Sequence, residues 1–161
     1  MGFASTPLTL IHVLLSLLGI LAGFIAVFGM ITGKRLDGWT AVFLVTTALT
    51  SITGFFFPFQ KVTPGIILGI TSLIVLAIAI PARYVKHLAG GWRKTYAVTA
   101  TIALYLNVFV LVAQLFEKVP AIHALAPTQT EPPFKIVQLL LLILTIVLIT
   151  LAAKRFRSPL P

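Results

Sequence analysis

Five long apolar stretches constrain this chain more than any other feature of its sequence. They cover residues 8–31, 39–57, 65–84, 95–116 and 136–153, and they are almost free of charged side chains. A hydrocarbon core about 30 Å thick is crossed by a helix of about 20 apolar residues, close to the length of each stretch. A lipid-facing barrel strand would instead alternate apolar and polar residues over about 10 positions. The sequence therefore predicts an all-α transmembrane helical bundle of five spans.

These spans leave no room for a separate soluble domain. We expect a single integral membrane domain over residues 1–161, in which the longest connection is a loop at residues 117–133. With 59% hydrophobic and only 9% charged residues, the chain has too few ionised groups to cover a soluble globule. The absence of cysteine excludes disulfides, cysteine zinc sites and thiol catalysis. The net charge of +9 would favour nucleic-acid binding only on a water-soluble body, so we expect no nucleic-acid partner.

The distribution of Lys and Arg predicts the orientation of the spans. Basic residues gather on the cytoplasmic side of multi-pass proteins. If the spans alternate, one side carries nine of them: Lys34, Arg35, Arg83, Lys86, Arg93, Lys94, Lys154, Arg155 and Arg157. The other side carries three: Lys61, Lys118 and Lys135. This asymmetry predicts an outside N-terminus, a cytoplasmic C-terminus and an outer position for the loop at 117–133.

Small residues predict how the helices associate. In lipid, helices pack through small side chains and interhelical hydrogen bonds, and Gly65 and Gly69 form such a pattern. One interpretation is that this face packs inside the bundle. The alternative is that Gly65 and Gly69 contact a second copy of the chain or a partner membrane subunit.

Polar residues concentrate in the outer half of the predicted bundle. His12 lies about one turn inside the first span, and Asn107 and Gln114 share one face of the fourth. The outer loop adds Glu117, His123 and Glu131. Polar groups inside spans usually face the bundle interior. They either hydrogen-bond across helices beneath a sealing loop, or form an outward-facing pocket for a small ligand, an ion or a lipid headgroup.

Two further functions remain open for the same residues. His12 and His123, with Glu117 or Glu131, have the nitrogen and oxygen ligands of a divalent-metal site, so a metal- or haem-linked redox protein is an alternative. No close histidine spacing supports it, so we assign no metal and no cofactor. A third possibility is a small channel or transporter whose path is lined by Asn107 and Gln114.

Basic residues form a rim on the predicted inner side. Topology alone accounts for them, and attraction to anionic lipid headgroups follows from their charge. The rim comprises Arg83, Lys86, Arg93, Lys94, Lys154, Arg155 and Arg157.

No catalytic motif is present. The sequence has no Gly-x-Ser-x-Gly, no phosphate-binding loop, no His-Glu-x-x-His and no paired carboxylates within a span. We therefore expect a non-enzymatic membrane protein that binds a lipid-like or small polar ligand, or that serves as a subunit of a membrane assembly.

Several short segments resemble small, uncharacterised bacterial multi-pass membrane proteins. They are Gly33–Trp39, Thr53–Phe59, Leu106–Phe109 and Ala124–Phe134. The resemblance implies a location in the bacterial inner (plasma) membrane. It implies no activity, and no site residue can be transferred from it.

Overall fold

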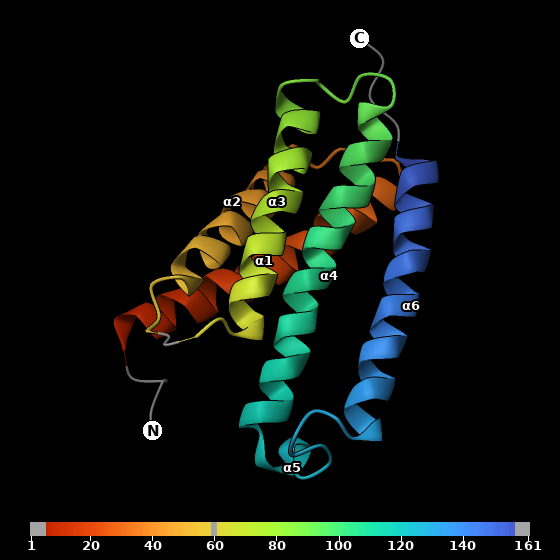
Figure 1. Ribbon diagram of the computed structural model, residues 1–161. Helices are drawn as coiled ribbons and strands as arrows, with labels where there is room; N and C mark the ends of the chain where they lie inside the picture. Colours follow the sequence, from red (N-terminus) through yellow and green to blue (C-terminus); the bar gives the residue numbers. More distant parts are fainter. Residues whose placement is uncertain (1–5, 59–60, 157–161) are drawn as a thin grey trace.

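The computed structural model describes residues 6–58 and 61–156, and within these residues the chain is all-α. Figure 1 shows the arrangement of its helices. Six helices form, in the order α1 (Pro7–Ile31), α2 (Asp37–Gly54), α3 (Pro64–Tyr84), α4 (Trp92–Lys118), α5 (Pro120–His123) and α6 (Pro132–Arg155).

Threonine and proline define where two of the long helices begin. Thr6 precedes Pro7 and accepts a hydrogen bond from the backbone N–H of Thr9 at 3.2 Å. Thr63 precedes Pro64 and accepts in the same way from the N–H of Ile66 at 3.3 Å. A threonine cap satisfies a free N–H of the first turn, and proline costs nothing there because its missing N–H is not needed. These residues therefore fix the starts of α1 and α3.

Four of the helices are long and apolar enough to cross a membrane: α1, α3, α4 and α6. The second predicted span does form a helix, α2, but α2 is not among these four candidates. Six of its 18 residues are Thr or Ser, and it begins with Asp37. Hydropathy therefore separates α2 from the others although the prediction grouped them together.

The bundle consists of an α1–α2 hairpin and a layer formed by α3, α4 and α6. In Figure 1, α1 runs obliquely across the more upright α3, α4 and α6, and α4 lies between α3 and α6. The core is built largely of small side chains where these helices meet. Fully or almost fully buried alanines are Ala22, Ala26, Ala79, Ala82, Ala97, Ala100, Ala103 and Ala152. Small residues allow close backbone approach, which is the main source of helix packing in lipid.

Two glycines of α1 allow it to pack closely against α2 and α4. A Cβ atom added to Gly23 would lie 2.7 Å from Leu104 Cδ1 and 2.9 Å from the Phe43 ring. One added to Gly19 would lie 3.0 Å from Thr46 Oγ1. Gly19 thus packs inside this chain against α2, and Gly23 packs against both α2 and α4.

Gly65 and Gly69 lie in two different environments. A Cβ atom on Gly69 would lie 3.4 Å from the ring of Phe55, so Gly69 packs within the chain. Gly65 is exposed, and its Cβ position meets only Thr63 Oγ1, at 3.7 Å. Contact between this face and a second copy or a partner subunit stays a prediction.

Candidate functional site

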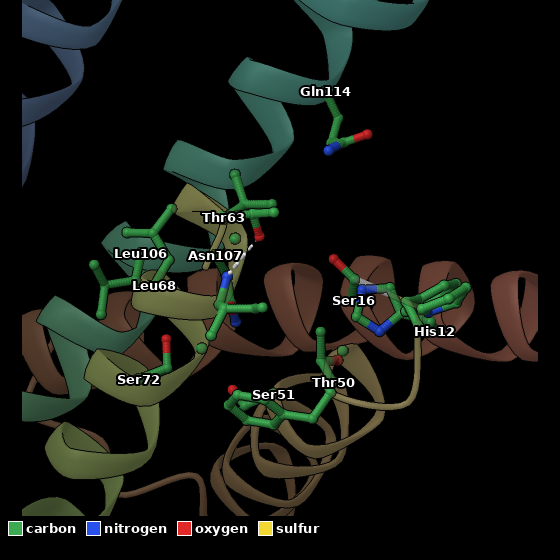
Figure 2. A pocket seen from close by; sticks show the side chains of 18 residues that line it. His12, Ser16, Thr50, Ser51, Thr63, Leu68, Ser72, Leu106, Asn107 and Gln114 are labelled. Atoms are coloured by element: carbon green, nitrogen blue, oxygen red, sulfur yellow. Dashed lines mark hydrogen bonds between the residues drawn. The ribbon is translucent and has the colours of Figure 1, made fainter. Parts of the chain in front are cut away.

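A cavity lined by many polar side chains lies where α1 and α3 begin and α2 ends. This polar cavity has a volume of about 250 Å³ and is bounded by α1, α2, α3 and α4. Figure 2 shows His12 and Ser16 on α1 and Asn107 and Gln114 on α4 around it. Its polar lining residues are His12, Ser16, Thr50, Ser51, Thr63, Ser72, Asn107 and Gln114.

A second cavity adjoins the polar cavity and opens between α1 and the last turns of α4. This lateral cavity has a volume of about 420 Å³. The two cavities share His12, Ser16, Phe57, Val110 and Gln114. The lateral cavity is further lined by Thr9, Val13, Leu17, Leu111, Leu115, Glu117, Lys118 and Val119.

His12 joins α1 to α2 at the wall of both cavities. Its Nδ1 atom lies 2.8 Å from Thr53 Oγ1, and its ring packs edge-on against Phe57 with centroids 5.2 Å apart. The Thr53 hydroxyl donates its one hydrogen to the carbonyl of Thr50 at 3.1 Å. With that hydrogen directed to Thr50, Thr53 accepts from the Nδ1–H of His12, and Nε2 is then an acceptor.

The two amides of α4 differ in how far they are already bonded. Asn107 is buried, and its Nδ2 donates to Thr47 Oγ1 at 3.1 Å, which ties α4 to α2. The Gln114 side chain takes part in none of the hydrogen bonds found within the described part of the chain. Gln114 therefore brings an amide donor and an amide acceptor to the boundary between the two cavities.

Two hydroxyl groups of α2 line the polar cavity, and both donate to carbonyls of their own helix. Thr50 donates to the carbonyl of Thr46 at 2.7 Å, and Ser51 donates to the carbonyl of Thr47 at 2.9 Å. A hydroxyl that donates still has lone pairs with which to accept. The α2 wall of the polar cavity therefore offers acceptors, whereas Gln114 supplies an available donor.

The loop between α4 and α6 is held by hydrogen bonds to α4 and by hydrogen bonds within itself. His123 Nδ1 lies 3.0 Å from the carbonyl oxygen of Phe116, and Gln129 donates to the carbonyl of Ala113 at 2.9 Å. Glu131 accepts from the backbone N–H and the hydroxyl of Thr128. Desolvation raises the pKa of Glu131, but the hydrogen bonds from Thr128 and Thr130 outweigh it, and the pKa lies below its ordinary value.

The structure therefore places four of the six predicted pocket residues at a cavity and the other two elsewhere. His12, Asn107 and Gln114 line the polar cavity, and Glu117 lines the lateral cavity. His123 and Glu131 belong to the loop and are not among the residues that line either cavity. Within residues 6–58 and 61–156, no three His, Asp or Glu side chains are grouped so as to hold a metal ion.

Arg83, which the sequence places in the basic rim, has a buried side chain. This side chain pairs with the Asp37 carboxylate and lies over the Tyr96 ring, 5.1 Å from the centroid. Arg35 pairs with the same carboxylate at 2.7 Å. Desolvation raises the pKa of Asp37, but the hydrogen bonds and charges of Arg35 and Arg83 more than offset it, so this pKa is lowered.

The other basic residues of this end are mainly at the surface. Arg93 donates to the carbonyl of Phe156 at the end of α6, and Lys86 lies 5.5 Å from the Trp92 ring centroid. Lys86, Lys94, Lys154 and Arg155 are exposed. Arg157 lies outside the described residues.

Sequence reasoning did not identify the lateral cavity or the part played by Phe57 and Thr63. Both residues lie near the α2–α3 connection, where polar spacing along a helix gives no signal. The six Thr and Ser residues of α2 are the signal in the sequence that could have indicated a helix lining a polar space.

No protein-family model, curated protein or solved structure matches the chain. The resemblance to small bacterial multi-pass proteins therefore identifies no family, and what the structure supports is the set of four candidate membrane helices.

Proposed function

We propose that this protein is a non-enzymatic, five-span protein of the bacterial inner membrane whose polar cavity binds an uncharged polar group. The N-terminus lies outside and the C-terminus in the cytoplasm. The bound group belongs to a lipid-like or small polar molecule. The observation that carries this proposal is the convergence of His12, Asn107 and Gln114 on one cavity.

Support for a fifth span comes from the contacts at the two ends of α2. Asp37, at its start, pairs with Arg83 near the end of α3. Thr53, near its end, bonds to His12 near the start of α1. The helix thus runs between the same two ends of the bundle as α1 and α3. Four of its six hydroxyls donate to its own carbonyls, which lowers the cost of placing them in a lipid bilayer.

The orientation rests on the basic residues. With α2 as a span, the exposed Lys86, Lys94, Lys154 and Arg155 lie at the cytoplasmic end, where they would also attract anionic lipid headgroups. The polar cavity then faces the outer leaflet, at the opposite end.

An uncharged ligand is favoured by the lining of the polar cavity. No Asp, Glu, Lys or Arg lies among the described residues that line it. An ion placed there would lose its hydration without gaining a partner charge, which costs far more than burying a hydrogen-bonded neutral group. Acceptors on α2 and the free amide of Gln114 suit a ligand that carries both a hydroxyl and a carbonyl oxygen.

The experiment compares Gln114→Leu with Gln138→Leu by native mass spectrometry of protein purified in mild detergent. Gln114 faces both cavities, whereas Gln138 lies on α6 and donates to the carbonyl of Phe109 at 3.3 Å. We expect the native chain and Gln138→Leu to retain an uncharged molecule that Gln114→Leu loses. Equal occupancy in all three proteins would contradict the proposal.

A further inference from the structure

We infer that the lateral cavity holds a hydrocarbon chain, so that the ligand is a single-chain, uncharged amphiphile that enters sideways from the outer leaflet. This inference rests on the proposed function, because it places the polar head of the same molecule in the polar cavity.

The polar cavity and the lateral cavity share part of their lining. Five residues line both, and they include His12 and Gln114, which carry the polar groups at the boundary. A molecule whose head occupies the polar cavity can therefore extend into the lateral cavity without crossing a packed helix interface. At about 420 Å³, the lateral cavity lies within the range of about 300–1,000 Å³ that is usual for small-molecule sites.

The lateral cavity has several apolar lining residues and lies at an edge of the bundle. Val13, Leu17, Leu111 and Leu115 line it, and none of these lines the polar cavity. Val13, Leu17 and Leu115 also remain 40–46% exposed, so they lie at an edge that faces the surroundings of the bundle. Residues of α1 line one side of the cavity, and residues from the last turns of α4 line the other. In a membrane, the surroundings of this edge are lipid chains.

The lateral cavity is lined by one acidic and one basic residue. Glu117 and Lys118 both line it, at the end of α4. Their formal charges cancel, so together they give an anionic or cationic head no net attraction. The preference for an uncharged head therefore comes from the polar cavity, where no Asp, Glu, Lys or Arg is found among the described lining residues.

The experiment measures binding of two uncharged probes, monopalmitin and monoacetin, by native mass spectrometry in mild detergent. The two share a glycerol head and an ester carbonyl but differ in chain length. Leu111→Trp fills the lateral cavity, and Leu142→Trp, on the exposed face of α6, is the matched control. We expect Leu111→Trp to weaken monopalmitin binding by about tenfold or more while monoacetin binding stays unchanged.

The outcomes separate this inference from the function on which it rests. If Gln114→Leu weakens the binding of both probes but Leu111→Trp affects neither, the polar cavity stands and the chain site is wrong. If Gln114→Leu affects neither probe, the proposed function itself fails. If Leu142→Trp weakens monopalmitin binding as much as Leu111→Trp does, the probe binds the lipid-facing surface and the chain site is also wrong.

Discussion

The hydrogen bond between His12 and Thr53 joins two helices at the wall of both cavities. Among the described residues it is the one side-chain hydrogen bond between α1 and α2, and with the Thr53 hydrogen directed to Thr50 it places the histidine proton on Nδ1. The free Nε2 atom is then an acceptor for a ligand hydroxyl. His12 therefore combines a structural bond with an available binding group.

Replacing Thr53 with valine removes this bond and keeps the shape of the side chain. Hydrogen bonds between membrane helices contribute about 0.6 kcal/mol on average, so we expect the thermal unfolding midpoint in detergent to fall by about 1–3 °C. Thr150→Val is the control, because Thr150 is exposed and donates only to Ile146 of its own helix. A midpoint equal to that of Thr150→Val would show that the His12–Thr53 bond does not stabilise the hairpin.

The predictability of individual residues depends on how far apart their partners lie in the sequence. Asn107 and Gln114 share a face of one helix, and helical spacing alone brought them to the same cavity. The ion pair of Arg83 with Asp37 joins residues 46 positions apart, and it depends on how the hairpin packs on α3. No local pattern distinguished a buried Arg83 from an exposed one.

At the level of helices, close approach at Gly23 determines how the hairpin packs. Phe43 is fully buried, so its ring has little room to move away from an added Cβ atom. We expect Gly23→Ala to lower the free energy of unfolding by about 1–3 kcal/mol. Gly38→Ala is the matched control because nothing lies within 4 Å of its Cβ position. Chemical unfolding in detergent measures both, and equal stability of the two variants would contradict the packing described for α1.

The ion pair between Asp37 and Arg83 gives the opposite end of the hairpin a dependence on pH. The pKa of Asp37 is lower in the folded protein than its ordinary value of 3.8. The carboxylate therefore stabilises the fold above that ordinary value, and this stabilisation is lost as the pH falls through the folded pKa. We expect the unfolding midpoint of the native chain to fall over this acidic range.

Asp37→Asn tests this dependence directly. At neutral pH the variant leaves the buried Arg83 without its anionic partner, so we expect a lower unfolding midpoint than in the native chain. Its midpoint should also lack the part of the acid dependence that Asp37 supplies. An acid profile parallel to that of the native chain would show that another carboxyl group is responsible.

The apolar stretches predicted the helices well, but not the differences among them. The third stretch, residues 65–84, corresponds closely to Pro64–Tyr84, because Thr63 and Pro64 mark its start. The helices of the fourth and fifth stretches, α4 and α6, begin three to four residues earlier than those stretches, because their first turns carry Lys, Arg or Pro. The lateral cavity depends on how obliquely α1 crosses α4, which hydropathy does not encode.

For the whole molecule, the position of α2 decides the location of the binding site. If α2 crosses the membrane, the polar cavity and the basic end lie on opposite sides. If it does not, Lys34 and Lys61 lie on the same side, and the basic residues divide only seven to five between the two sides, which indicates the orientation much less strongly. The side on which Lys61 lies is therefore central to the proposed function.

Single-cysteine labelling tests this point most directly, because the native chain contains no cysteine. The variants are Lys34→Cys, Lys61→Cys and Thr128→Cys, all at exposed positions. A membrane-impermeant maleimide is applied to intact spheroplasts and, separately, to permeabilised ones. We expect Lys61→Cys and Thr128→Cys to react in intact spheroplasts, and Lys34→Cys to react only after permeabilisation. Reaction of Lys34→Cys and Lys61→Cys from the same side would contradict the five-span account and the outer position of the cavity.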